Sequence, residues 1–170
     1  MKKILTILLS ASILVSCSDD FTEIDPIGSL SDAALQNATG VDLLLTGAYS
    51  VLDGIRNGGP GADWTKSGDN WWLDAISDDA HKGSTDGDQA DLLLIELFDW
   101  GSTNPYFEGR WQALFAGVNR ANAVIDLINN SADPSSFSVE LAQARFLRGH
   151  YNFELQRMWV NVPYISDENY

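Results

Sequence analysis

The side chains best suited to hydrolytic chemistry in this 170-residue chain are its carboxylates, and Asp78-Asp79 is the most suggestive pair. A glycosidase needs two carboxylates that flank one bond across roughly 5 to 10 Å. Adjacent residues on a helix point about 100° apart, so this pair does not readily flank a bond. The sequence also contains no nucleophile elbow and no phosphate-binding loop. We therefore predict a protein without catalytic residues and keep a glycoside hydrolase as the weaker alternative.

Three further aspartates, Asp86, Asp88 and Asp91, are close enough in the chain to suggest a calcium loop. A calcium loop would need further oxygen ligands and a glutamate, which this segment lacks. His81 and His150 lie far apart and have no cysteine or carboxylate at a spacing typical of zinc sites. We predict neither a metal site nor a cofactor.

The only cysteine, Cys17, ends a segment with the features of a bacterial export signal. Residues 1–3 are basic, and residues 4–15 are uncharged but too few to cross a bilayer, which requires about 20 apolar residues. Leu14-Val15-Ser16-Cys17 has the pattern of a lipobox, in which small residues precede an obligatory cysteine. We predict that residues 1–16 are a signal peptide and that Cys17 is lipidated with acyl chains such as palmitate. A plain secretory signal with a chance cysteine is the alternative.

The residues that follow Cys17 suit a membrane tether. Each buried acyl CH₂ contributes roughly 0.8 kcal/mol, so several chains on this cysteine would hold the protein durably. Ser18-Asp19-Asp20 is polar and resembles the acidic signal that sends some bacterial lipoproteins to the cell exterior. Residues 21–30 contain Pro and Gly and favour an extended lead-in. We assign residues 17–38 to this lipidated tether and lead-in.

The charge balance limits the partners of the chain. The formal net charge is −14, and loss of Lys2 and Lys3 with the signal peptide would bring it to −16. We do not expect so acidic a protein to bind nucleic acid or anionic lipid headgroups. The apolar fraction of 45% is ordinary for a globular domain.

The first half of the chain predicts one amphipathic helix and a long irregular region. Thr39 can cap the helix, with Asp42 three residues further on. Residues 57–91 are rich in Gly and Asp and predict loops with one short helix at about 69–80. Residues 92–98 predict a further helix, because no second strand pattern exists to pair with them. The helix after Thr39 places its apolar residues on one face, at Val41, Leu44, Leu45, Ala48, Leu52 and Ile55.

The second half predicts two long antiparallel helices, an αα-hairpin of the kind that builds helical solenoids. Asn104-Pro105 opens the first helix and Asn129-Asn130 ends it. Ser138 caps the second, which continues to about Trp159 and includes Arg148 in an apolar stripe, where we expect a carboxylate partner. The seam of the first helix is formed by Phe107, Trp111, Leu114, Val118, Ala121, Ile125 and Ile128. The second helix is apolar on two faces, which predicts burial between neighbours, with one face at Leu141, Ala144, Tyr151, Leu155 and Met158 and the other at Phe146 and Phe153.

Several segments resemble motifs of one protein family, the SusD/RagB nutrient-uptake lipoproteins. Residues 111–122 are similar to its W-x-x-hydrophobic-aromatic-x-G-hydrophobic-x-x-A-N helix, and residues 144–155 to its A-x-F-L-R-A-x-x-Y-F-x-L helix. Val162-Pro163-Tyr164 matches the V-P-hydrophobic ending, and two upstream segments, 45–49 and 77–83, are also typical. The chain departs from the pattern at Gly149, where alanine is usual, and at Asn161, in a stretch that usually carries glycine.

The resemblance implies an all-α fold of TPR-like helical hairpins, or solenoid, with irregular loops. It also implies a place on the outer face of the outer membrane, where members capture oligosaccharides, or sometimes peptides, and deliver them to a SusC-like TonB-dependent transporter. Because family members are far longer, residues 39–170 are expected to form an incomplete N-terminal helical domain. The alternatives are a purely structural protein that closes the transporter without a ligand site of its own, and a surface glycoside hydrolase.

Exposed aromatic rings are the candidates for contacting a sugar, because sugars stack their C–H faces on such rings and direct hydroxyls to amides and carboxylates. We expect Trp111 and Trp159 in the core, since the first lies on the seam and the second closes a helix. Trp100 lies in a polar loop before the long helix and could present its ring together with the amide of Asn104. We therefore predict Trp100 and Asn104 as glycan-binding residues. Packing of Trp100 beneath the helix is the alternative.

Overall fold

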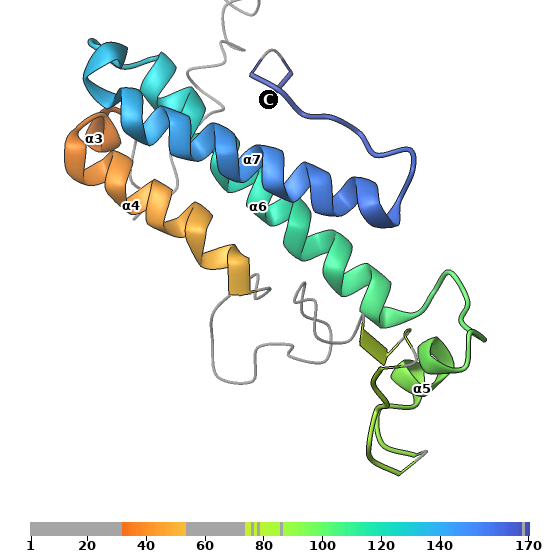
Figure 1. Cartoon of the computed structure of the whole chain (residues 1–170). Helices are drawn as coiled ribbons and strands as arrows, with labels where there is room; N and C mark the ends of the chain where they lie inside the picture. The colour runs from red at the N-terminus through yellow and green to blue at the C-terminus, as the bar shows by residue number, and fades with distance from the viewer. Residues whose placement is uncertain (1–31, 54–73, 76, 78, 86, 168) are drawn as a thin grey trace, which may run out of the picture. The chain divides into compact units, whose positions relative to one another are not determined.

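The computed structural model describes residues 32–53, 74–75, 77, 79–85, 87–167 and 169–170 (Figure 1). Cys17 and the predicted signal peptide and tether lie outside these residues, apart from the end of the tether. The chain divides into two units, Met1–Ala34 and Leu35–Tyr170, and the helical core lies in the second. No strand occurs in the described part of the chain, so the predicted all-α class is confirmed. Its elements are α3 (Asp32–Leu35), α4 (Ala38–Tyr49), η1 (Ser50–Asp53), α5 (Ala90–Glu96), α6 (Pro105–Asn129), η4 (Pro134–Phe137) and α7 (Ser138–Met158).

Helix α6 begins and ends where the sequence predicts. The Asn104 side chain accepts a hydrogen bond from the Tyr106 backbone N–H at 3.0 Å, and Pro105 occupies the first turn, where its missing N–H does no harm. At the other end, the Asn130 N–H reaches the Asp126 carbonyl at 3.0 Å. The predicted helix over residues 92–98 is also confirmed, as α5, although it ends two residues earlier.

Two predicted helix caps are wrong. Helix α4 is capped by Asn37, whose side chain accepts from the Gly40 N–H at 3.1 Å, so Thr39 already lies inside the helix. Ser138 is the first residue of α7 and makes no capping bond, because the short helix η4 runs directly into α7. Asp133 caps η4 instead, by accepting from the Ser135 N–H at 3.2 Å. A cap depends on the extended backbone of one residue, which the sequence pattern locates only to within a few positions.

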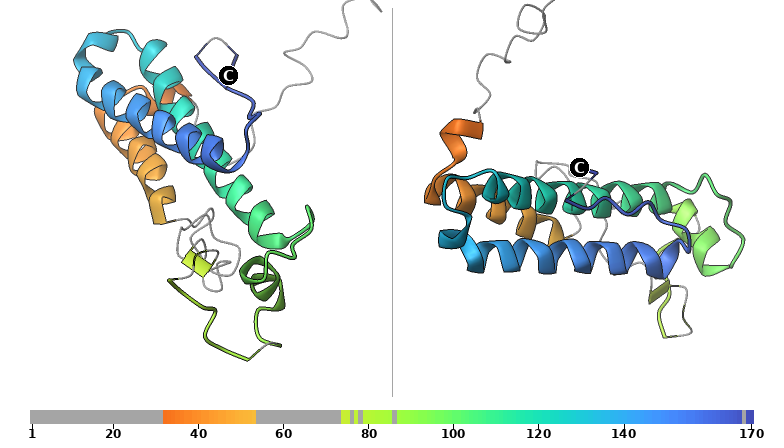
Figure 2. Two further views of the ribbon diagram at one scale, coloured as in Figure 1. Left: turned by 45° about the vertical axis from the view of Figure 1, so that its right-hand side comes forward. Right: turned by 90° about the horizontal axis from the view of Figure 1, so that it is seen from above.

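Helices α6 and α7 form the predicted hairpin, and α4 packs against both (Figures 1 and 2). Their shared core confirms most of the predicted apolar positions. It contains Val41, Leu45, Ala48, Val51, Leu114, Val118, Ala121, Val124, Ile125, Leu127, Ile128, Ala144, Leu147, Tyr151 and Leu155. Trp111 and Trp159 pack partly buried against this core, with their rings in an edge-to-face contact at 5.1 Å between centroids. None of the described helices is both long enough and apolar enough to cross a membrane.

The three helices are also joined by hydrogen bonds to backbone carbonyls at the end of α4. The Tyr151 hydroxyl of α7 donates to the Ala48 carbonyl at 2.6 Å, and burial raises the pKa of this phenol to about 12. From α6, the Arg120 guanidinium donates to the Gly47 carbonyl at 3.0 Å and to the Ser50 hydroxyl at 2.9 Å. A cation at this end of α4 also compensates the negative pole of the helix dipole.

The chain after α7 turns back along the hairpin (Figure 1). The Asn122 amide donates to the Ile165 carbonyl at 3.1 Å, and its oxygen accepts from Arg148 at 2.9 Å. Arg148 also pairs with the Asp167 carboxylate, which confirms the predicted carboxylate partner. The hydrogen bond from Arg148 lowers the pKa of Asp167 below its ordinary value.

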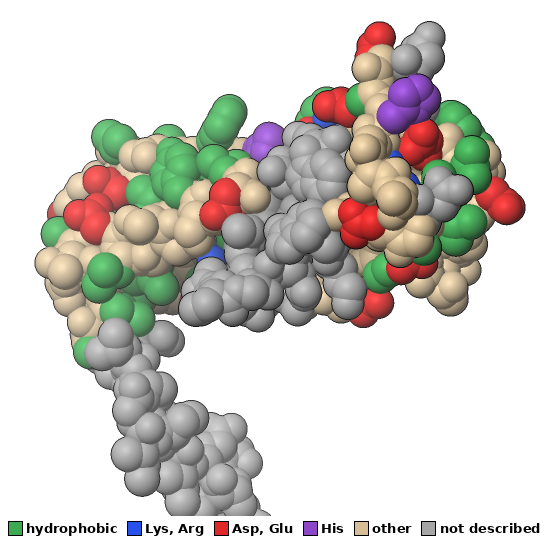
Figure 3. Space-filling view, turned by 90° about the horizontal axis from the view of Figure 1, so that it is seen from below, with side chains coloured by type: hydrophobic (Ala, Val, Ile, Leu, Met, Phe, Trp, Pro, Cys, Tyr) green, Lys and Arg blue, Asp and Glu red, His purple; other side chains and the backbone are tan. Residues whose placement is uncertain are grey.

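The second apolar face of α7 differs from its prediction. Phe146 and Phe153 are 72% and 60% exposed, so the described residues cover α7 on one face only. The predicted helix at about 69–80 lies largely outside the described residues, and Asp74 and Ala75 adopt a 3₁₀ turn. The predicted acidity is visible on the face shown in Figure 3, where Asp and Glu side chains are scattered over the surface and Lys and Arg hardly appear.

Candidate ligand-binding site

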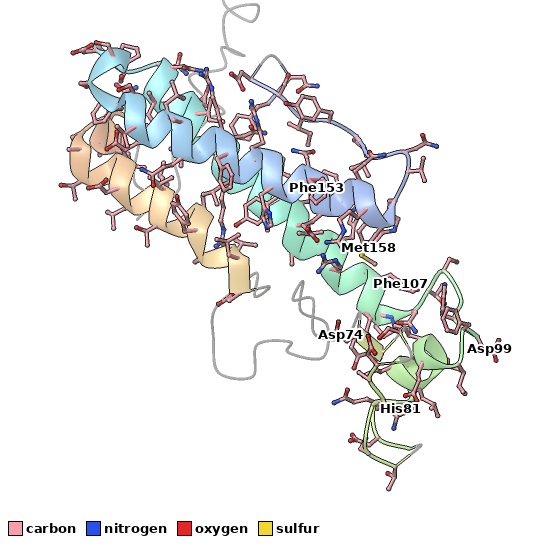
Figure 4. All side chains as sticks on the ribbon, viewed as in Figure 1. Asp74, His81, Asp99, Phe107, Phe153 and Met158 are labelled. Carbon is pink, nitrogen blue, oxygen red and sulfur yellow. The ribbon has the colours of Figure 1, made fainter. Side chains whose placement is uncertain are left out.

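A pocket of about 770 Å³ lies where the loop before α6, the start of α6 and the end of α7 meet. Its volume is in the range that small-ligand sites occupy. Figure 4 shows Phe107 of α6 and Met158 of α7 near each other in this region. The described residues that line the pocket are aromatic or apolar at Trp100, Phe107, Met158 and Trp159, polar at Ser77 and Ser102, and charged at Arg110, Glu154 and Arg157.

Trp100, the predicted sugar-stacking residue, lies on the wall of this pocket. Its ring contacts the Phe107 ring edge-to-face, at 5.9 Å between centroids, yet the residue remains 40% exposed. Trp100 thus combines features of the two interpretations, packing beneath the helix and exposure to a sugar. Its ring packs against Phe107 in the first turn of α6, and part of the residue is open to solvent. A ring held in this way is fixed in direction and can still be covered by a ligand.

Phe98 extends this aromatic surface and adopts an unusual backbone conformation. Its φ is +57°, and it occupies the left-handed position of a Schellman motif that ends α5. The Phe98 N–H donates to Ile95 at 3.1 Å and the Asp99 N–H to Leu94 at 2.9 Å. Glycine is usual there, and a bulky residue costs on the order of 1–2 kcal/mol.

The strained Phe98 is nevertheless 65% exposed, and its ring lies 5.5 Å from that of Trp100 between centroids. Because the side chain is mostly exposed, its burial offsets little of the conformational cost of the positive φ. We take this as support for a role of Phe98 at the surface. Phe98 could not be predicted as a site residue from the sequence, because nothing in the residue pattern signals a positive φ at phenylalanine.

Asn104, the second predicted sugar-binding residue, is buried, and its side chain makes two hydrogen bonds within the protein. Its carbonyl oxygen caps α6 through the Tyr106 N–H, and its amide nitrogen donates to the Asp91 carbonyl at 2.8 Å. It does not line the pocket described above. In the structure, Asn104 fixes the end of the loop that carries Trp100, and the two residues are not presented together.

Three charged residues connect α6 and α7 at the pocket. The Arg110 guanidinium bonds the Glu154 carboxylate at 2.6 Å, and their side chains are 1% and 8% exposed. The same carboxylate accepts from Arg157 at 3.0 and 3.1 Å. A buried carboxylate persists only with such partners, because its desolvation is costly. The pairing of Arg110 with Glu154 could not be predicted from the sequence, since these two residues are 44 positions apart and their contact depends on the register of the hairpin.

Lys82 holds the loop that contains Asp88, one of the aspartates that suggested a calcium loop. The Lys82 ammonium donates to the Thr85 and Asp88 carbonyls at 2.5 and 2.9 Å. The Glu96 carboxylate holds the start of this segment: it accepts a hydrogen bond from the Lys82 backbone N–H at 3.0 Å and lies 2.7 Å from Nδ1 of the His81 ring. The backbone hydrogen bond from Lys82 is the main cause of the lowered pKa of Glu96. Among the described residues, no group of three or more His, Cys, Asp or Glu side chains is arranged to hold a metal ion. Asp78 and Asp86 lie outside those residues.

Comparison with known proteins places these features in a family. No curated protein matches the chain. Residues 43–170 match the family model of SusD-like proteins, which is described as "Starch-binding associating with outer membrane". The match includes the hairpin, the pocket and the segment after α7. The chain therefore belongs to the SusD-like family of starch-binding proteins that associate with the outer membrane.

Proposed function

We propose that this protein is a surface lipoprotein that captures nutrient oligosaccharides and hands them to a TonB-dependent transporter. The family description, which names starch binding at the outer membrane, supports the general role. It names binding and no reaction, which favours a non-catalytic protein over the alternative of a surface hydrolase. Peptides are a second ligand class that the family resemblance allows.

The observation that carries the proposal is the partly exposed Trp100 ring on the wall of a pocket that also contains polar side chains. A sugar ring needs an apolar surface for its C–H face and hydrogen-bonding groups around it. The pocket offers the first through Trp100 and Phe107 and the second through Ser102 and the charged cluster. Phe98 adds a second exposed ring beside Trp100.

The anchor is proposed on sequence grounds. Residues 1–16 serve as the signal peptide, Cys17 carries the lipid, and residues 17–38 form the tether between the membrane and the helical domain, 39–170. The acidic Ser18-Asp19-Asp20 directs the protein to the cell exterior. In this arrangement the lipid holds the domain at the surface, where oligosaccharides arrive.

Isothermal titration of the full chain with malto-oligosaccharides tests the proposed site. Trp100→Ala should weaken binding roughly tenfold or more, because covering one aromatic ring contributes on the order of 1.5–3 kcal/mol. Phe146→Ala is the matched control, since it removes an exposed aromatic ring of α7 outside the pocket and should leave affinity unchanged. Equal affinity of the Trp100→Ala and unaltered chains, with folding intact, would remove Trp100 from the site.

The two alternative functions give different results in the same experiment. A purely structural protein that closes the transporter should show no affinity for any oligosaccharide. A hydrolase should release reducing ends during the titration, which a reducing-sugar assay detects.

A further inference from the structure

We propose that the Trp100 pocket takes an acidic oligosaccharide, whose carboxylate or sulfate group binds the guanidinium of Arg157. The inference rests on the proposed function and specifies the class of sugar. It is carried by the charged cluster at the pocket, which a site for a neutral glucan does not require.

The pocket differs in charge from the rest of the chain. The described residues that line it include two arginines and one glutamate, so these side chains together carry one net positive charge, whereas the whole chain carries −14. No other Asp or Glu of the described residues lines the pocket. An anionic group is therefore attracted to this site and repelled by much of the remaining surface.

Glu154 is shared between two guanidinium groups. Among the described residues that line the pocket it is the only carboxylate, and it accepts hydrogen bonds from Arg110 at 2.6 Å and from Arg157 at 3.0 and 3.1 Å. A carboxylate that is divided in this way leaves the more exposed guanidinium, that of Arg157, able to attract a second anion.

Arg157 is also placed to receive such an anion. The residue lies in the last turn of α7 with its side chain 53% exposed. Within the described structure its guanidinium hydrogen-bonds through one terminal nitrogen, Nη1, to both oxygens of Glu154. The Nε and Nη2 donors point along another edge of the planar group, and that edge matches a carboxylate or sulfate with two parallel hydrogen bonds.

Two contacts hold Arg157 in place before a ligand arrives. Glu154 fixes Nη1, and the centre of the guanidinium lies 5.9 Å from the centroid of the exposed Phe153 ring. A cation over an aromatic face is weakly attracted to it. The arginine thus loses less side-chain freedom on binding than a free surface arginine would, which favours affinity.

The test compares two probes with the same sugar backbone, one charged and one neutral: galacturonic acid oligomers and their methyl esters, titrated into the full chain by calorimetry. The unaltered protein should bind the acid at least about tenfold more tightly than the ester, as expected of one charge-assisted pair of hydrogen bonds. In Arg157→Gln this ratio should fall towards one. Dextran sulfate oligomers against dextran form a second arm, and a preference found in one arm only identifies the anion as carboxylate or sulfate.

Arg145→Gln is the matched control, because Arg145 lies on the same helix, is 52% exposed and is 3.8 Å from Asp167, outside the pocket. It should keep the preference for the acid. Thermal unfolding of each variant by circular dichroism shows whether the fold is intact.

Equal binding of acidic and neutral probes that Trp100→Ala still weakens would overturn the acidic preference and leave the proposed function standing. An acidic preference that survives Arg157→Gln would also overturn the assignment. Failure of all four sugars to bind, while malto-oligosaccharides still bind in a Trp100-dependent way, would overturn the acidic preference alone. Failure of these four sugars and of malto-oligosaccharides would overturn both proposals.

Discussion

At the scale of single residues, Gly117 and Gly149 show how position decides what a glycine does. Both lie within long helices, α6 and α7. A Cβ at Gly117 would come within 2.7 Å of three Tyr151 ring atoms, whereas a Cβ at Gly149 meets nothing within 4 Å. The first glycine permits the close approach of α6 and α7, and the second has no such role. Alanine is usual in the family motif at 149, and the open space there accommodates it.

We therefore expect opposite effects from the same substitution. Gly117→Ala should lower the free energy of unfolding by about 1–3 kcal/mol, because the Tyr151 ring must move and its bond to Ala48 is strained. Gly149→Ala should raise it by up to about 1 kcal/mol, since alanine favours a helix over glycine. Urea unfolding followed by circular dichroism measures both. A Gly117→Ala chain as stable as Gly149→Ala would show that the two helices do not approach as closely as described.

At the scale of elements, the segment after α7 depends on an ion pair that is sensitive to pH. Arg148 lowers the pKa of Asp167 below its ordinary value of 3.8. A carboxyl whose pKa is lower in the folded state stabilises the fold above the unfolded pKa, and this stabilisation is lost as the pH falls through the folded pKa. The pair thus helps to hold the segment at neutral pH, and this contribution is lost in acid.

Asp167→Asn should consequently be less stable than the unaltered chain at pH 7, by on the order of 1 kcal/mol for a partly exposed pair. The difference should begin to close below pH 3.8 and vanish at lower pH, where both chains carry a neutral side chain at 167. Asp42→Asn, at an exposed position of α4, is the control and should show a much smaller difference. Thermal unfolding across this pH range provides the comparison, and a difference that persists at pH 2 would exclude the ion pair as its cause.

The elements also show which features the sequence could predict. Helix α6 was located correctly because its seam, Asn104-Pro105 and Asn130 are local signals. The cap at Asn37 and the positive φ of Phe98 were missed, since each depends on one residue's backbone. The contact between Arg110 and Glu154 was missed because it depends on how two helices pack. The loop with Trp100 was identified from its composition, but the pocket around it arises only when the ends of α6 and α7 come together.

At the scale of the whole molecule, the proposed function requires that the chain be delivered to the cell surface, where its pocket would meet oligosaccharides. We expect Cys17→Ala to lose the proposed lipid, because the diacylglyceryl group would be attached through the cysteine sulfur. Metabolic labelling with a fatty-acid analogue should mark the unaltered chain and leave the variant unmarked. Equal labelling of both would show that the anchor lies elsewhere.

The central claim is that an oligosaccharide binds over Trp100, and hydroxyl-radical footprinting with mass spectrometry tests it most directly. With saturating malto-oligosaccharide or galacturonic acid oligomers, oxidation of Trp100 and Phe98 should fall several-fold, because a stacked sugar covers both rings. Oxidation of Tyr164, an exposed ring outside the pocket, should not change. Unaltered oxidation of Trp100 in the presence of a bound oligosaccharide would contradict the account and place the ligand on another surface.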